Sequence, residues 1–153
     1  MTDTHNNTSS ALMETYRGAI YPWQCDHVGH MNVMWYVGQF DEATWCCFTE
    51  LGLTPSSLRA NVRGMAAVDQ RIAYLKELHP GDTVAVRTGL IEVREKTLKF
   101  FHEMRLVESG VLAAVTLLTA VHMDTAARKS APLPPDVAAR AKARVISDYK
   151  LPW

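Results

Sequence analysis

The chain has 153 residues, 48% of them apolar, and its 16 basic and 16 acidic side chains give a formal net charge of zero. This length suffices for one hydrophobic core and excludes two domains of ordinary size. Interspersed charges of both signs favour neither nucleic acid nor a membrane as a partner, and no apolar run reaches the length of a membrane span. We expect a disordered tail at 1–12, one domain at 13–145, a short tail at 146–153, and a cytoplasmic location because the start lacks a secretory signal.

The first predicted element is a short strand over residues 13–22, which ends at Pro22. A polar loop follows from Gln24 to Gly29 and carries one acid, Asp26. The chain then enters about twenty residues with helical spacing of apolar positions, and Gly52 is placed to end that helix. Asp26 therefore stands just before the start of a long helix.

One stripe of this helix is apolar, and the opposite side is not properly polar, so we expect a helix covered on most sides. The predicted buried stripe consists of Val33, Tyr36, Val37, Phe40, Ala43, Thr44, Cys47, Phe48 and Leu51.

The position of Asp26 just before a helix has two interpretations. Backbone N–H groups of a first helical turn are unpaired and carry partial positive charge, so they can polarise a carbonyl oxygen or hold an oxyanion. A carboxylate beside them makes an acyl-transfer site. An Asp at such a position also commonly caps the loop or the helix, and spacing alone does not decide between the two roles.

The second half of the chain changes period from helix to strand. Residues 53–64 are rich in turn formers, and residues 132–142 predict a proline-marked turn and a short amphipathic helix. Between them, alternating apolar residues and short turns predict strands over residues 66–78, 83–93, 97–106 and 111–123. One strand, one long helix and four more antiparallel strands make an α+β layer, with the helix covering one face of the sheet.

The run from Asp26 to Asn32, DHVGHMN, followed by Tyr36, Phe40 and Glu42, resembles the signature of the 4-hydroxybenzoyl-CoA thioesterase family of the hot dog superfamily. The resemblance implies a hot dog fold, an antiparallel sheet of about five strands wrapped around one central helix. It further implies hydrolysis of a small acyl-CoA thioester in a homodimer or homotetramer with sites between subunits. No cofactor is expected.

The same resemblance assigns the catalytic carboxylate to Asp26. Some relatives carry a second aspartate two residues earlier, where this chain has Gln24. Asp26 could attack the thioester carbonyl or draw a proton from water, and the sequence does not separate these routes. Backbone N–H groups around Asn32 and Val33 are the expected oxyanion donors.

Four alternatives remain open. Cys25, His27 and His30 could form a metal cluster, but no second ligand group with zinc-like spacing exists, so we expect no metal. Cys25 could be a nucleophile with His27 as its base. An Asp26–His30 pair would suit a hot dog hydratase, although the spacing and the expected Asn-Pro of that family are missing. A non-catalytic acyl-CoA-binding protein is the fourth possibility.

Aromatic residues cluster around the loop and helix and bear on the substrate. If some of them line the acyl pocket, they suit a flat aromatic acyl group or a trimethylammonium group, such as that of betainyl-CoA. The second option agrees with a loose resemblance of the chain to thioesterases of carnitine and betaine breakdown. The residues expected to contact substrate are His30, Asn32, Val33, Trp35, Tyr36 and Trp45.

Overall fold

The computed structural model describes residues 12–153, so the tail predicted for residues 1–12 lies outside the described residues except for its last position. The elements in chain order are β1 (Met13–Ala19), the 3-10 helix η1 (Pro22–Gln24), α2 (Val33–Glu50), α3 (Pro55–Ala60), β2 (Arg63–Tyr74), β3 (Thr83–Val93), β4 (Thr97–Leu106), β5 (Leu112–Asp124), β6 (Lys129–Ser130) and α4 (Pro135–Lys142). None of the helices in this part of the chain is long and apolar enough to cross a membrane.

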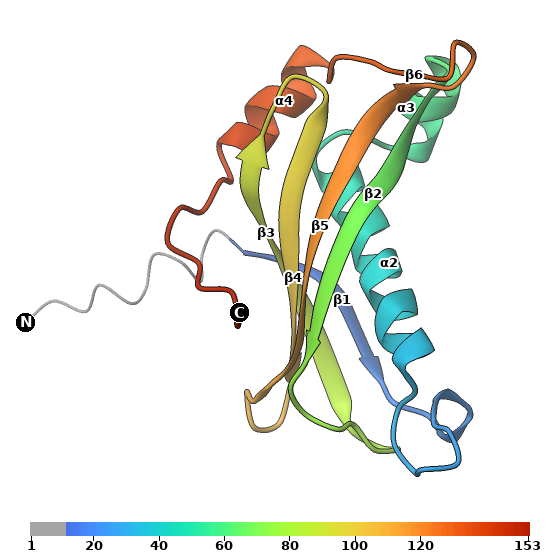
Figure 1. Cartoon of the computed structure of the whole chain (residues 1–153), viewed down its shortest axis with the longest axis vertical. Coiled ribbons are helices and arrows are strands. Elements are labelled where there is room, and N and C mark those ends of the chain that lie inside the picture. The colour runs from blue at the N-terminus through green and yellow to red at the C-terminus, as the bar shows by residue number, and fades with distance from the viewer. Residues whose placement is uncertain (1–11) are drawn as a thin grey trace, which may run out of the picture.

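The strands form one antiparallel sheet in the order β1-β3-β4-β5-β2, and the short β6 pairs with the end of β5. Figure 1 shows this sheet curling, with α2 running lengthwise along one face and α3 and α4 near one end. The predicted fold class, an α+β arrangement of about five antiparallel strands and one long helix, is confirmed.

Two clusters of buried side chains hold α2 against the sheet. One gathers around Phe48, Phe100 and Leu118, and the other around Phe40 and Met104. Because each large apolar side chain contributes roughly 1.5–3 kcal/mol when fully buried, these clusters fix the helix along its length.

The opposite side of α2 is open in a single copy of the chain. Val33 and Val37, which the spacing places on the buried stripe, are exposed, and so are Met34 at 64% and Trp45 at 43%. The expectation of a helix covered on most sides is therefore wrong for the chain by itself, because the described elements pack against only one face of α2.

Two stretches differ from the predicted elements. The turn-rich region 53–64 contains α3, where the Thr54 hydroxyl accepts a hydrogen bond from Ser57 N–H at 3.2 Å and Leu58 is buried. Strand β2 ends at Tyr74 rather than Leu78, because the N–H groups of the next two residues both donate to the same carbonyl of β5, at 2.8 and 3.0 Å. The chain leaves the ladder there and forms a wall of the pocket described below.

A buried histidine links α2 to the sheet. His102 is fully buried between the rings of Phe40 and Phe100, at centroid distances of 5.8 and 5.4 Å. Its Nε2 lies 2.8 Å from the Thr44 hydroxyl and its Nδ1 lies 2.6 Å from the Thr88 hydroxyl. Since Thr44 already donates to the Phe40 carbonyl, Nε2 carries the proton and Nδ1 accepts.

The other face of the sheet carries a buried acid. Glu103 is 2% exposed and is paired with Arg87 at 2.9 Å and Arg105 at 3.1 Å, and the Tyr149 hydroxyl donates to it at 3.1 Å. Burial raises the pKa of Tyr149, so the phenol stays protonated and can donate.

Residues 146–153 follow this face. The Tyr149 ring stacks on Phe101 at 3.6 Å, and Ile146 N–H donates to the Leu90 carbonyl at 2.8 Å. A Cβ atom at Gly89 would lie 2.6 Å from the Phe101 ring, so glycine is required for this packing. Farther along, the Arg71 guanidinium lies 4.4 Å from the ring centre of Trp153.

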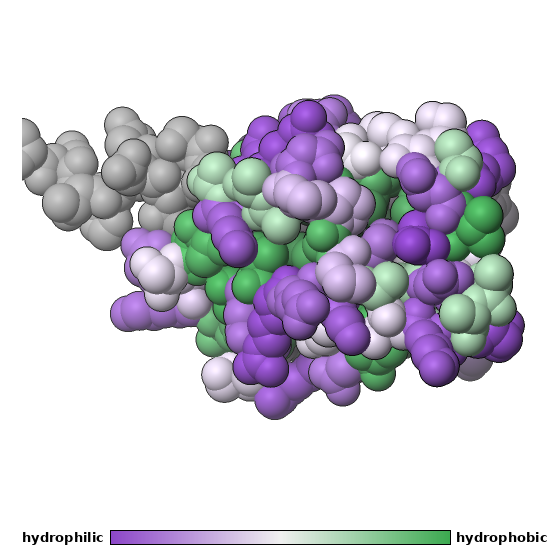
Figure 2. Space-filling view, turned by 90° about the horizontal axis from the view of Figure 1, so that it is seen from above, coloured by the Kyte–Doolittle hydropathy of each residue, from purple (hydrophilic) through white to green (hydrophobic). Residues whose placement is uncertain are grey.

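Figure 2 views the end of the molecule that is uppermost in Figure 1. Hydrophilic and hydrophobic residues alternate over this end, and neither kind covers it alone.

Candidate active site

The loop that carries Asp26 closes on itself through its backbone. Asp26 N–H donates to the His30 carbonyl at 3.3 Å, and Gly29 N–H donates back to the Asp26 carbonyl at 3.0 Å. Gly29 has a φ of 91°, a left-handed conformation that glycine adopts without strain. Met31 N–H donates to the Leu78 carbonyl at 2.7 Å, which ties the loop to the chain after β2.

Both oxygens of the Asp26 carboxylate accept a hydrogen bond. The Asn32 side-chain amide donates to Oδ2 at 2.7 Å, and Val28 N–H donates to Oδ1 at 3.0 Å. These bonds, with that from Asn32 the stronger influence, lower the pKa of Asp26 below its ordinary value of 3.8. The carboxylate is therefore ionised at neutral pH, and each oxygen keeps a lone pair for a water or a substrate. It also closes the loop, as Asp commonly does.

Asn32 connects this carboxylate to the helix. While its amide nitrogen holds Asp26, its Oδ1 accepts from Met34 N–H at 2.9 Å as the cap of α2. The Asn32 N–H donates to the Gln24 carbonyl at 2.9 Å, and Trp35 N–H donates to the Asn32 carbonyl at the same distance. Within residues 12–153 the Val33 N–H has no hydrogen-bond partner. Of the two amides expected to hold an oxyanion, that of Val33 is available and that of Asn32 is already paired.

A pocket of about 240 Å³, here called the Tyr36 pocket, lies where α2 begins and β2 ends. The Tyr36 hydroxyl donates to the Lys76 carbonyl at 3.0 Å, and its ring meets Tyr74 edge-on at 5.2 Å. Burial raises the pKa of Tyr36 to about 12, so the phenol stays neutral. Val33, His30 and Met31 complete one wall, and Leu75, Lys76 and Glu77 complete the other. Asp26 is in the adjoining loop and is not itself among the lining residues.

The His30 ring is directed at the second wall. Its Nε2 lies 3.6 Å from the Glu77 carboxylate and its ring meets His79 edge-on at 6.4 Å. A carboxylate–imidazole pair between Asp26 and His30, as a hydratase would need, has no direct hydrogen bond among the described residues.

The described residues also contain no group of three or more His, Cys, Asp or Glu side chains able to hold a metal ion. Cys25 Sγ lies 3.7 Å from the Tyr21 carbonyl, which it can contact as a weak donor. Burial raises the pKa of Cys47 to about 12, so this thiol is not activated.

The aromatic residues that were expected to contact the substrate lie in different places. Tyr36 lines the pocket, whereas Trp35 packs half-buried against the core cluster of α2. Trp45 lies about 18 Å along the helix from Val33, at about 1.5 Å per residue, and packs edge-on against Phe48 at 5.6 Å. The structure therefore brings His30, Val33 and Tyr36 together and leaves Trp45 apart.

Sequence reasoning missed the second wall of the pocket. The strand predicted over residues 66–78 includes Leu75, Lys76 and Glu77, whereas the structure ends β2 at Tyr74 and places these three residues in the pocket wall. The available signal was an aromatic residue at a strand end shortly before the Pro80-Gly81 turn.

Comparisons with known proteins identify the family and support the fold. The family model described as the thioesterase-like superfamily matches residues 20–141. The chain is 27% identical to the betainyl-CoA thioesterase of Pseudomonas aeruginosa over 94% of this chain and 90% of that protein. A hypothetical protein of Staphylococcus aureus, solved in complex with CoA, is 17% identical over 93% of this chain and 90% of its own, with a TM-score of 0.83. A 1,4-dihydroxy-2-naphthoyl-CoA thioesterase from Synechocystis is 20% identical over 84% of this chain and 95% of its own, with a TM-score of 0.75.

Proposed function

The chain belongs to the thioesterase-like superfamily and is an acyl-CoA thioesterase, and we propose that Asp26 is its catalytic carboxylate. The observation that carries the proposal is the bond from the Asn32 amide to Asp26 at 2.7 Å. Asn32 thereby links an ionised carboxylate to the start of the helix, where Val33, the next residue, has an unpaired N–H. Thioester hydrolysis requires this combination of a base or nucleophile with an oxyanion donor.

The reaction consumes one water and releases the acid and the CoA thiol. In one route Asp26 removes a proton from water, whose oxygen attacks the carbonyl carbon. In the other, an Asp26 oxygen attacks first, the thiolate leaves, and water then hydrolyses the resulting anhydride. In both routes the carbonyl oxygen becomes an anion, and the Val33 N–H with the partial positive charge of α2 stabilises it.

The active unit is a dimer in which β2 pairs with β2 of a second copy. In support, β2 is the last strand of the sheet and residues 66–71 are exposed, with Val68 at 60%. An exposed edge of this kind presents unpaired backbone groups that another strand can complete. The Tyr36 pocket alone, at about 240 Å³, is smaller than the roughly 300–1,000 Å³ of most ligand sites and is walled by the end of this same strand.

The charges of β2 favour one register. In an antiparallel pair related by a two-fold axis at Gln70, Asp69 faces the partner subunit's Arg71 and Arg71 faces the partner's Asp69. The same register sets Ala66 opposite the partner's Tyr74, so the two strands overlap from residue 66 to residue 74.

Reversing one of these charges is expected to weaken the dimer. Asp69→Arg places cations opposite each other on both sides of the axis and raises the dimer Kd about tenfold in sedimentation equilibrium. Combining it with Arg71→Asp recreates opposite charges and returns the Kd to within about threefold of the parent. Trp153→Leu controls for the ring contact that Arg71 loses. A double variant weaker than the single one would exclude this register.

The acyl group is a small one with a trimethylammonium end, as in betainyl-CoA. The neighbouring rings of Tyr36 and Tyr74 suit a cation–π contact. The Glu77 carboxylate also lines this pocket, and its negative charge offsets the positive charge of Lys76. The 27% identical betainyl-CoA thioesterase independently suggests this substrate.

A pair of substrates of equal shape tests the acyl group. Betainyl-CoA and 3,3-dimethylbutyryl-CoA differ in the charge of one central atom, and we expect kcat/KM to favour the first by about tenfold or more. The ratio should fall severalfold in Tyr74→Leu, which removes a ring without changing the intrinsic reactivity of either ester. A ratio that is the same in both enzymes would exclude recognition of the cation by this pocket.

A further inference from the structure

Gln24 is a buried residue at the beginning of the loop that carries Asp26. It is 8% exposed, and its side-chain Oε1 accepts a hydrogen bond from Tyr21 N–H at 2.8 Å. Its own N–H donates to the Tyr21 carbonyl at 2.9 Å, so the two residues are joined twice and η1 is closed. The amide oxygen is the atom that faces Tyr21, because a backbone N–H can only donate.

The main chain of Gln24 holds the far end of the same loop. Its carbonyl accepts from Asn32 N–H at 2.9 Å, and next to this bond Cys25 and Met31 form an antiparallel bridge. The two segments therefore run side by side as a short ladder. A displacement of Gln24 moves Asn32 with it.

Asn32 passes this constraint on to the carboxylate. Its amide nitrogen donates to Asp26 Oδ2 at 2.7 Å, while its Oδ1 accepts from Met34 N–H at 2.9 Å. Because the Asn side chain is short and adopts few rotamers, it serves both partners only from a narrow range of backbone positions. The carbonyl of Gln24 fixes that backbone position.

Gln24 makes these contacts without adding a charge to the loop. Asp26 is the only acid in residues 24–32, and the Cα atoms of residues 24 and 26 lie at most ~7 Å apart. The groups that act on the charge of Asp26 are His27 and His30 of the same loop, and the Glu77 carboxylate faces His30 at 3.6 Å. An acid in place of Gln24 would add repulsion to the ionised form of Asp26.

Resting on the proposed function, we propose that Gln24 is a positioning residue of the active site, which holds Asn32, and through it the Asp26 carboxylate, in place without adding a charge. Gln24 is not a catalytic residue, because its amide oxygen is buried against Tyr21 N–H. Its acceptor and its lack of charge are separate properties, and different substitutions remove them one at a time.

Gln24→Met tests the acceptor, because it has nearly the same shape and leaves Tyr21 N–H unpaired. We expect kcat to fall about tenfold with KM within about twofold of the parent, since the carboxylate is misplaced and the remaining substrate contacts are kept. Gln24→Glu keeps the acceptor at the third position of the helical turn and should restore kcat at about pH 8 to within about threefold of the parent. A Glu variant as slow as the Met variant would overturn the proposal.

A double-mutant cycle tests whether Gln24 acts through Asn32. Asn32→Ser keeps a capping oxygen for α2 and removes the amide that holds Asp26. In this background Gln24→Met should change kcat by less than about twofold, because the link that it disturbs is already absent. Equal tenfold losses in both backgrounds would show that Gln24 acts on the fold in general and not through Asn32.

The effect of charge is measured as a pH profile. Hydrogen bonds, chiefly that from Asn32, keep the pKa of Asp26 below 3.8, so the rate of the parent should fall with acid only below about pH 4. In Gln24→Glu the added anion should move this fall upward by about half a pH unit to one unit. The ¹³C resonance of the Asp26 carboxyl carbon reports the same shift without turnover. A titration identical to that of the parent would contradict the role given to the neutral amide.

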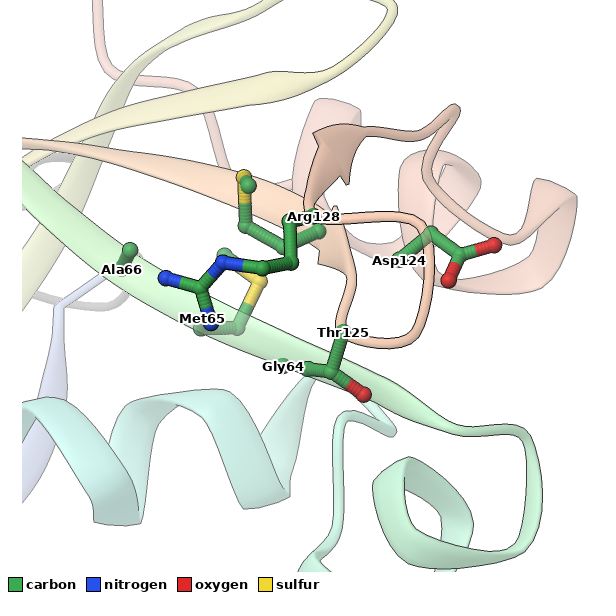
Figure 3. Close-up of a pocket in the computed structure, with 7 residues that line it drawn as sticks. Gly64, Met65, Ala66, Asp124, Thr125 and Arg128 are labelled. Carbon is green, nitrogen blue, oxygen red and sulfur yellow. The ribbon is translucent and has the colours of Figure 1, made fainter.

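Thr125 offers a matched control at the other end of β2. Figure 3 shows it beside a pocket of about 270 Å³ that Gly64 and Met65 help to bound. Met65 lies about 30 Å along β2 from Tyr74, at about 3.3 Å per residue. The Thr125 hydroxyl donates to the Val62 carbonyl at 3.1 Å, so Thr125→Val also removes one bond between a side chain and a backbone group of a turn. We expect this variant to lose stability and to keep the parental kcat.

The results separate this inference from the function on which it rests. A slow Asp26→Asn enzyme together with a Gln24→Met enzyme of parental kcat would overturn the inference alone. An Asp26→Asn enzyme with the parental rate would instead overturn the proposed function. Circular dichroism of each variant shows that the compared enzymes are folded.

Discussion

Asp26→Asn is expected to lower kcat for acyl-CoA hydrolysis by about 10²- to 10⁴-fold, the range for losing a positioned base or nucleophile. The substitution removes the charge and keeps the shape, and the remaining carbonyl oxygen can still accept a bond from Val28 or Asn32, so the loop should fold as before. Steady-state rates at saturating acyl-CoA, with circular dichroism as a check on folding, give the answer.

Asp41→Asn provides the control, since it makes the same change at an exposed position of α2. An Asp26→Asn enzyme as fast as the Asp41→Asn enzyme would rule out Asp26 as the catalytic carboxylate. A single turnover in ¹⁸O-labelled water detects the nucleophilic route. The label enters the Asp26 carboxylate when an anhydride forms and water attacks its aspartyl carbon, and a general base cannot give this result.

The second large effect is a loss of stability in acid that originates at His102. Complete burial lowers the pKa of His102 from 6.5 to about 3, so the folded protein holds it neutral. The unfolded chain binds a proton below pH 6.5 and the folded chain does not, so this contribution to stability is full above pH 6.5 and is lost progressively as the pH falls towards 3. The slope approaches ~1.4 kcal/mol per pH unit, measured as the free energy of unfolding in urea.

His102→Phe isolates this effect, because it keeps an aromatic ring between Phe40 and Phe100 and cannot titrate. At pH 7 the variant should be less stable by about 1–2 kcal/mol, since Thr44 and Thr88 each lose a bond to the imidazole. Its stability should fall less steeply with acid, and the two curves should cross between about pH 5 and pH 6. A difference between the proteins that stays constant from pH 7 to 4 would contradict the assignment.

The sequence revealed the parts of this molecule that depend on local pattern. The turns on either side set the predicted strand bounds at 83–93, which are those of β3 (Thr83–Val93), and the helical period located α2 after the Asp26 loop. Asn32 is of a residue type that commonly caps helices, and its side chain caps α2 by accepting a bond from Met34 N–H. These features require contacts only between residues a few positions apart.

The features that the sequence did not reveal depend on contacts between residues that are distant along the chain. The Tyr36 pocket exists because β2 ends at Tyr74, and that ending is set by Ala113 on another strand. The exposure of Val37 follows from the absence of any described element on that side of α2, which a periodic pattern cannot report. Glu103 is likewise a polar position of an alternating strand, and two arginines and Tyr149 make its burial possible.

The open edge of β2 has a consequence for how the molecule assembles. In the proposed dimer, the chain completes its sheet only by pairing with another copy. Folding then finishes in a second-order step, and its half-time lengthens as the solution is diluted. The hydrogen bonds of His102 to Thr44 and Thr88 form within a single polypeptide. Their contribution to the free energy of unfolding is therefore independent of protein concentration. Refolding traces recorded over a hundredfold range of concentration would thus resolve the two events by their order.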